Sequence, residues 1–162
     1  KIGLPWMIGI AICFPGLACI LSGAIFPEFY KKTKNYLVPI SIAFFAVGYV
    51  VMYFTHSFAT QTLANLLIGF GSGMLTPYIL NLTSQKVGKT HRDAAYGLVT
   101  SGIHIGYLIA PFAQLAILTI SGNGTPRFLF GFSAVMLIIA TIVTVFIAIK
   151  KPNQIESEIA VE

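Results

Sequence analysis

Five long stretches of apolar residues follow one another along the chain, separated by short polar segments. They cover residues 4–26, 36–54, 60–82, 94–120 and 128–149. A helix needs about 20 mostly apolar residues to cross the hydrocarbon core of a bilayer, and none of these stretches alternates as the strands of a membrane barrel do. The pattern predicts an all-α, polytopic membrane protein with five transmembrane helices over residues 1–150. The polar residues 151–162 are expected to form a disordered tail.

Composition supports a membrane protein over a soluble one. The chain is 56% hydrophobic and 9% charged, whereas soluble domains carry about 25% charged residues. Cys13 and Cys19 lie six residues apart on one predicted helix, so their spacing indicates neither a disulfide nor a metal site. The three histidines lie at different depths, and no acidic residue lies in the middle of a stretch. We therefore expect no metal and no cofactor.

Positive charges cluster after the first, third and fifth apolar stretches. The three clusters are Lys31, Lys32 and Lys34; Lys86, Lys89 and Arg92; and Lys150 and Lys151. If every stretch crosses the membrane, all three clusters lie on one side, and only Lys1 and Arg127 lie on the other. The positive-inside rule then makes the C-terminus cytoplasmic, in a plasma membrane or a cell inner membrane. Membrane anchoring accounts for the net charge of +5, and no long basic face predicts nucleic-acid binding.

The beginning of the chain favours a missing upstream portion. Lys1 leads almost directly into an apolar run that reaches Phe26, which is longer than the apolar core of a signal peptide. An odd number of crossings with an external start also indicates that at least one more helix comes before it.

Polar side chains are concentrated in the third and fourth stretches. Helical spacing places a stripe on the fourth stretch, and it places three further polar residues on a common face of the third. The stripe comprises Thr100, Ser101, His104, Tyr107, Pro111 and Gln114, and the other face comprises Asn65, Ser72 and Thr76. We expect the two faces to line one cavity for substrate or protons.

Apart from tyrosines and cysteines, His104 is the only ionisable side chain that the sequence places well inside an apolar stretch. Ionisable groups are costly there and usually face an aqueous interior. One interpretation is that His104 contacts substrate and titrates during transport, because an imidazole has a reference pKa of about 6.5. The other is that His104 stays neutral and hydrogen bonds a neighbouring helix. The sequence leaves both open.

Small residues and prolines recur at helical spacing in the same two stretches. Gly69 and Gly73 form a small-xxx-small face, which allows a neighbouring helix to approach closely. Pro77 follows and permits a bend. The next stretch carries Gly102, Gly106 and Pro111.

These segments resemble the major facilitator superfamily. There, a glycine-rich helix with a late proline leads to a basic cytoplasmic loop and an R-G/D-x-A-x-G start of the next helix, which Arg92, Asp93, Ala95 and Gly97 match loosely. The run from Gly102 to Pro111 is similar to a G-x-x-x-G-x-x-x-x-P pattern in that next helix. The resemblance implies family helices eight to twelve, which is a C-terminal lobe lacking one helix and the whole N-terminal half.

The family's cytoplasmic gate motif is only partly present after the first stretch. Gly23, Lys31 and Lys32 match its leading glycine and trailing cations, while Glu28 lies one position late for its aspartate. Two interpretations remain for this gate loop. It latches one conformation through helix termini of the other half, or its lysines only anchor the topology.

The resemblance implies a secondary active transporter that works by alternating access, as symporter or antiporter. The first, third and fourth helices are expected to line the path, with the second and fifth outside. No nucleotide-binding loop appears, so an ion gradient, most simply of protons, is the implied energy source.

Efflux of a small molecule is favoured because no lysine or arginine lies in mid-span to hold an anion, and uptake of a neutral or weakly charged metabolite is the alternative. An enzyme is not expected, although Ser72 and His104 leave an intramembrane serine protease as an alternative of another class.

Overall fold

The computed structural model describes residues 5–33, 36–122 and 124–150. These residues form five α-helices and one short 3-10 turn, and the described part of the chain contains no strand. The helices are α1 (Pro5–Thr33), α2 (Leu37–Tyr53), α3 (Phe58–Lys86), α4 (Arg92–Ser121) and α5 (Pro126–Lys150), with the turn η2 at Lys89–His91. The all-α prediction is confirmed. The tail at 151–162 and the cations Lys1, Lys34 and Lys151 lie outside the described residues.

Four of the helical segments are long and apolar enough to cross a membrane. They are Cys13–Thr33, Phe58–Lys86, Lys89–Ser121 and Pro126–Lys150, while the apolar helix Leu37–Tyr53 is shorter, at 17 residues. The chain is therefore a polytopic membrane protein. Helical structure also continues past the predicted ends of the first and third stretches at residues 26 and 82, as far as Thr33 and Lys86.

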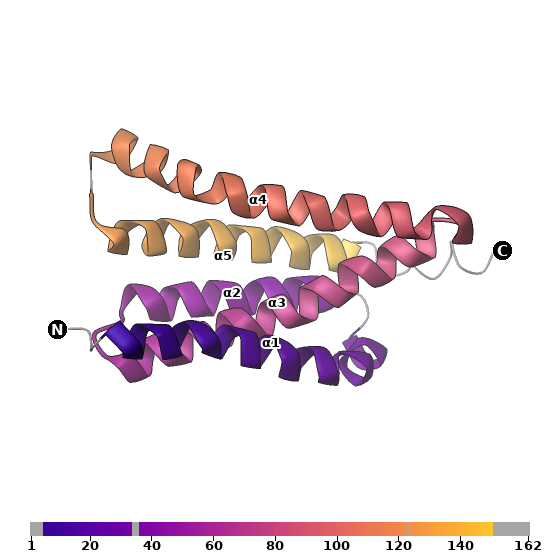
Figure 1. Cartoon of the computed structure of the whole chain (residues 1–162), viewed down its shortest axis with the longest axis horizontal. Helices are drawn as coiled ribbons and strands as arrows, with labels where there is room; N and C mark the ends of the chain where they lie inside the picture. The colour runs from indigo at the N-terminus through magenta and orange to yellow at the C-terminus, as the bar shows by residue number, and fades with distance from the viewer. Residues whose placement is uncertain (1–4, 34–35, 123, 151–162) are drawn as a thin grey trace.

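The helices run back and forth along the long axis of the molecule (Figure 1). α3 packs against α1 on one side and against α2 on another, and α2 in turn packs against α5. α4 touches α3 and α5 only sparsely. The order of close contacts is therefore α1, α3, α2 and α5, with α4 at the margin.

Glycines allow α3 to lie close to both of its neighbours. A Cβ atom added to Gly73 would lie 2.8 Å from Cys19 Cα of α1, and one added to Gly69 would lie 2.6 Å from Pro15 Cα. On the α2 side, a Cβ atom on Gly71 would lie 2.8 Å from the carbonyl oxygen of Ser41. The helix backbones therefore meet where side chains are absent, as membrane helices commonly do.

α2 differs from the expectation that it lies at the outside of the bundle. It lies between α3 and α5 and buries Pro39, Ser41, Ala46 and Gly48. The Ser41 hydroxyl donates to the Leu37 carbonyl at 2.9 Å, so it needs no partner from another helix. Because these residues are small and their polar groups are satisfied within the helix, α2 can face protein on two sides.

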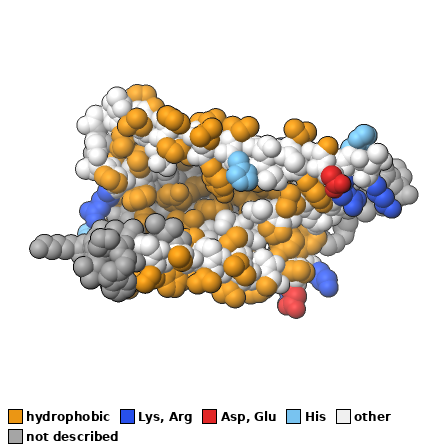
Figure 2. Space-filling view, viewed as in Figure 1, with side chains coloured by type: hydrophobic (Ala, Val, Ile, Leu, Met, Phe, Trp, Pro, Cys, Tyr) orange, Lys and Arg blue, Asp and Glu red, His pale blue; other side chains and the backbone are white. Residues whose placement is uncertain are grey.

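The described cations lie at helix ends. Lys31 and Lys32 end α1, Lys86 ends α3, and Lys150 ends α5. Those three ends lie at the end of the bundle where α4 begins (Figure 1), whereas Arg127 lies at the start of α5. Figure 2 shows hydrophobic side chains spread along the helices and charged side chains gathered towards the ends. The lysine-rich connections thus share one end of the molecule.

Candidate functional site

α4 carries the candidate site and is the most exposed helix of the molecule. None of its residues is buried, although its sequence is apolar enough to cross a membrane. Gly122 ends it in a left-handed conformation, with φ at 65°, which glycine adopts without steric cost. Even large apolar side chains of α4 are exposed: Leu98 is 76% exposed and Leu108 is 68% exposed.

Thr100, Ser101 and His104 line one open hollow on α4. The hollow measures about 700 Å³, and all six of its lining residues belong to α4, the other three being Tyr96, Gly97 and Ile105. The structure therefore brings together three members of the predicted polar stripe. Tyr107 lies next to them, with its ring centroid 6.2 Å from that of His104 in an edge-on arrangement.

The hydrogen bond of His104 fixes which of its nitrogens carries a proton. His104 Nδ1 lies 2.7 Å from the carbonyl oxygen of Thr100, one turn earlier in the same helix. A carbonyl oxygen only accepts, so Nδ1 donates, and in the neutral ring Nε2 keeps its lone pair. Nε2 is thus the ring nitrogen that can accept a hydrogen bond in the neutral imidazole.

Gln114 lies in a different hollow from His104. That hollow measures about 510 Å³ and lies among α2, α3, α4 and α5, where Gln114 meets Tyr49, Leu75 and Ser133 among its lining residues. The predicted stripe is therefore divided in the described structure. Pro111 lies between the two parts, inside α4.

The polar residues of α3 do not share the His104 hollow. Asn65 is half-buried and Thr76 is exposed, but neither belongs to the hollow's lining. Asn65, Gly69 and Gly73 share one side of α3 by helical spacing, and that side faces α1. The expected single cavity between the two polar faces is not formed by the described helices, because α4 touches α3 only sparsely.

The two glycine pairs have different surroundings. Gly69 and Gly73 lie against α1, whereas nothing lies within 4 Å of a Cβ atom added to Gly102 or Gly106. Helical spacing puts Gly102 and Gly106 on the side of α4 opposite to His104. The expected packing at this second pair is absent from the described residues, since no described helix covers that side.

The predicted gate loop is helical. Gly23, Glu28, Lys31 and Lys32 all lie within α1, which continues through Pro27 to Thr33. The Thr33 hydroxyl donates to the Phe29 carbonyl at 2.6 Å in this last turn, and a Cβ atom on Gly23 would lie 3.8 Å from the carbonyl oxygen of Gly73. The expectation of a loop was wrong because charged residues end a hydrophobic stretch without ending a helix.

Arg92 connects the lysine-rich ends of α3 and α4. Its Nη2 donates to the carbonyl oxygen of Ser84 at 3.2 Å, across the turn that joins the two helices. Cations at a helix C-terminus stabilise its unpaired carbonyl groups. Arg92 was expected as a topological anchor and as the first residue of the family pattern, but its bond to the end of α3 was not predicted, although its place just after a helix end was an available signal.

Ser72 and His104 do not form a protease-like pair in this structure. The Ser72 hydroxyl donates to the Gly69 carbonyl at 2.8 Å, and His104 is bonded to Thr100. Each side chain is thus engaged with its own helix. Among the described residues, no group of three histidine, cysteine or acidic side chains could hold a metal ion.

Comparisons with known proteins give one match. The family model described as Major Facilitator Superfamily matches residues 2–161. No curated protein and no solved structure matches the chain. The family match covers nearly the whole sequence, and the structure is an apolar helical bundle with its charges at the helix ends. The chain therefore belongs to the major facilitator superfamily, a family of membrane transporters.

Proposed function

We propose that this chain is part of a secondary active transporter that exports a small molecule in exchange for protons. The observation that carries the proposal is the hollow on α4, where Thr100, Ser101 and His104 lie together on a helix long and apolar enough to span a bilayer. Ionisable side chains at membrane depth are costly and mark substrate or proton pathways. His104 is accordingly the residue that we assign to the path.

The exposure of α4 supports a role inside a larger assembly. Its polar side carries His104, and its opposite side carries Gly102 and Gly106 with open space above them. Lipid satisfies neither a row of hydroxyls and an imidazole nor a small-residue face suited to close helix packing. We assign the two sides to the family's remaining helix and to an N-terminal half of the same transporter, which together would enclose the path.

The substrate class follows from the charges. Every lysine and arginine among the described residues lies at a helix end or a connection. The proposed path therefore offers hydroxyl and imidazole groups from Thr100, Ser101, His104 and the neighbouring Tyr107, without a fixed cation to hold an anion. Neutral or cationic molecules fit such a path better than anions do.

In the proposed orientation the lysine-rich end of the bundle faces the cytosol. His104 then lies between the two membrane surfaces, since α4 extends from Arg92 to Ser121. Alternating access would expose Nε2 of His104 to one surface and then to the other. Proton uptake on one side and release on the other would supply the driving force.

The test uses the full-length transporter in liposomes with an imposed pH gradient and ethidium, an amphipathic cation, as the probe. We expect gradient-driven ethidium transport, and a drop of at least about tenfold in His104→Gln, which can donate to Thr100 but cannot carry the proton. His91→Gln is the matched control, because His91 lies in the exposed turn η2 outside α4. Full gradient-driven transport in His104→Gln would refute the assignment of the proton site.

A further inference from the structure

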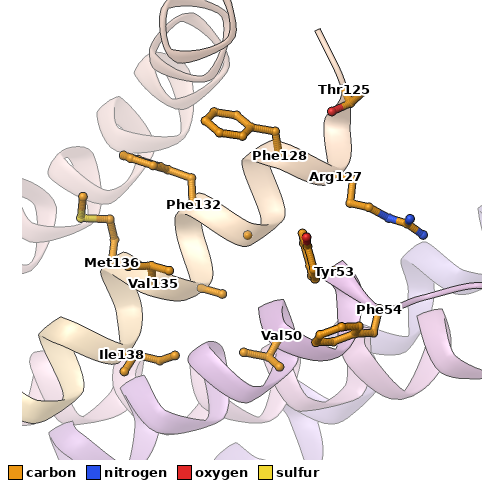
Figure 3. Close-up of a pocket in the computed structure, with 12 residues that line it drawn as sticks. Val50, Tyr53, Phe54, Thr125, Arg127, Phe128, Phe132, Val135, Met136 and Ile138 are labelled. Carbon is orange, nitrogen blue, oxygen red and sulfur yellow. The ribbon is translucent and has the colours of Figure 1, made fainter. Parts of the chain in front are cut away.

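A third hollow lies between the end of α2 and the start of α5, far from the lysine-rich end of the bundle. It measures about 650 Å³, and its lining is mostly apolar. Figure 3 shows Val50, Val135, Met136 and Ile138 along one part of it, with Phe128 and Phe132 above. Val135 is 55% exposed and Ile138 43% exposed, so the apolar part is an open groove on the surface of the bundle.

The same groove has a polar end. Arg127, Thr125 and the hydroxyl of Tyr53 lie at one end of the hollow, away from Val135 and Ile138 (Figure 3). The groove therefore changes from polar to apolar along α5, which is the direction from a membrane surface towards its interior. An amphipathic ligand is the kind of molecule that such a gradient fits.

Arg127 is held in place by the connection between α2 and α3, where its partners in the described structure, Thr55 and His56, are not acidic. Its Nη2 lies 3.3 Å from Nδ1 of His56 and 3.5 Å from the carbonyl oxygen of Thr55, both in the connection between α2 and α3. Of the described residues, the acidic ones are Glu28, near the end of α1, and Asp93, in the first turn of α4. Both helix termini lie at the opposite end of the bundle (Figure 1), so no carboxylate of the described side chains lies near the guanidinium charge at this end.

We propose that this groove binds an anionic phospholipid, with the phosphate on Arg127 and one acyl chain along the α2–α5 surface. Charge complementarity selects the headgroup, because a guanidinium forms short, charge-assisted hydrogen bonds with phosphate oxygens. Position selects a lipid over a soluble anion, because the apolar part of the groove lies alongside a helix with the highest mean hydropathy among the candidate spans, 2.8. A second copy of this chain would bring a further Arg127 rather than the missing negative charge.

The lipid would bind where two parts of the fold, α5 and the connection between α2 and α3, meet at the proposed outer surface. Arg127 already joins the start of α5 to the connection that contains Thr55 and His56. A phosphate bound there would add a negative charge to this junction, and an acyl chain would cover Val135 and Ile138. This proposal is independent of the transported substrate and of the role of His104.

The experiment is native mass spectrometry of the full chain, released from detergent after incubation with equal amounts of phosphatidylglycerol and phosphatidylcholine of the same acyl chains. We expect retention of phosphatidylglycerol over phosphatidylcholine, and a loss of about tenfold in that preference in Arg127→Gln. Lys150→Gln is the control, because it removes the same charge from the other end of α5.

A second variant tests the apolar half of the groove. Val135→Trp should reduce retention of both lipids, because an indole would occupy the acyl-chain position, and the exposed site tolerates a larger side chain. Equal retention of the two lipids by the unmodified chain would overturn the proposal. An unchanged preference in Arg127→Gln, or unchanged retention in Val135→Trp, would do the same.

Discussion

The contact between α1 and α3 depends on single missing side chains. At Gly73, an added Cβ atom would overlap the Ser22 hydroxyl and the Cys19 carbonyl oxygen, and Ser22 itself is fully buried. The Cys19 oxygen is a backbone atom and the Ser22 side chain is fully packed, so neither can rotate away. Close helix contact in a bilayer relies on such packing because lipid tails supply no hydrophobic drive between helices.

Gly73→Ala should therefore destabilise the purified chain by about 1–3 kcal/mol, the range typical of overpacking. Gly106→Ala is the matched control, because nothing lies within 4 Å of a Cβ atom added there. Thermal unfolding in detergent, followed by circular dichroism, measures both. Equal stabilities of the two variants would contradict the described α1–α3 contact.

At the scale of residues, the sequence predicted that glycines would allow close contact between helices, but not which helix each glycine would contact. The same four-residue glycine spacing occurs at Gly69 and Gly73, which meet α1, and at Gly102 and Gly106, which meet open space. Gly48 and Gly71 bring α2 and α3 together. They were not identified because neither has a second glycine four residues before or after it in its own helix. Which small residue is used depends on the neighbouring helix, and spacing along one helix carries no information on that.

At the scale of elements, the ends of the helices are set by capping and hydrogen bonding rather than by hydropathy. α3 starts at Phe58, with Ser57 as its N-cap in a reciprocal capping box. Ser57 Oγ accepts from the Thr60 backbone N–H at 3.3 Å, and Thr60 Oγ1 accepts from the Ser57 backbone N–H at 3.3 Å. Two backbone donors that a helix start leaves unpaired are satisfied in this way.

Ser57→Ala should cost about 1 kcal/mol of stability through loss of this cap. Ser57→Asp should restore most of it, because a carboxylate accepts the same bond and interacts favourably with the helix dipole. Thr62→Ala serves as the comparison, since the Thr62 hydroxyl only donates to the Phe58 carbonyl within the helix. Denaturation in detergent distinguishes them, and a Ser57→Ala protein as stable as Thr62→Ala would argue against the cap.

The number and type of elements could be predicted from apolar stretches, whereas their full lengths could not. Hydropathy falls at Pro27 and after Leu82, yet helical backbone continues to Thr33 and Lys86. Charged residues such as Lys31 leave the membrane without breaking the helix, because lysine has good helix propensity. The gate residues were consequently assigned to a loop when they occupy the last turns of α1.

At the scale of the whole molecule, the lateral order of the helices was the least predictable feature. α2 was expected outside because its stretch is almost free of polar side chains, but that property suits burial between α3 and α5 equally well. The polar faces of α3 and α4 were expected to meet, and instead α3 directs Gly69 and Gly73 to α1 while α4 remains exposed. Polarity along one helix identifies a face that needs a partner, but the partner depends on the remainder of the assembly.

The proposed transport path requires α4 to present one side to water and the opposite side to lipid or protein within the bilayer. Thr100 lines the His104 hollow, and Ala113 lies on the opposite side of α4 at a matching distance from its middle. With Cys13 and Cys19 replaced by alanine in the full-length transporter, each position receives a single cysteine. A charged thiol reagent reacts with the thiolate, which forms in water and not in lipid.

The most direct measurement is the rate at which that reagent modifies each cysteine in intact membranes. We predict that Thr100→Cys reacts at least about tenfold faster than Ala113→Cys, and that transported substrate slows its reaction. Equal rates at the two positions, or no reaction at Thr100→Cys from either membrane surface, would contradict an aqueous path along α4.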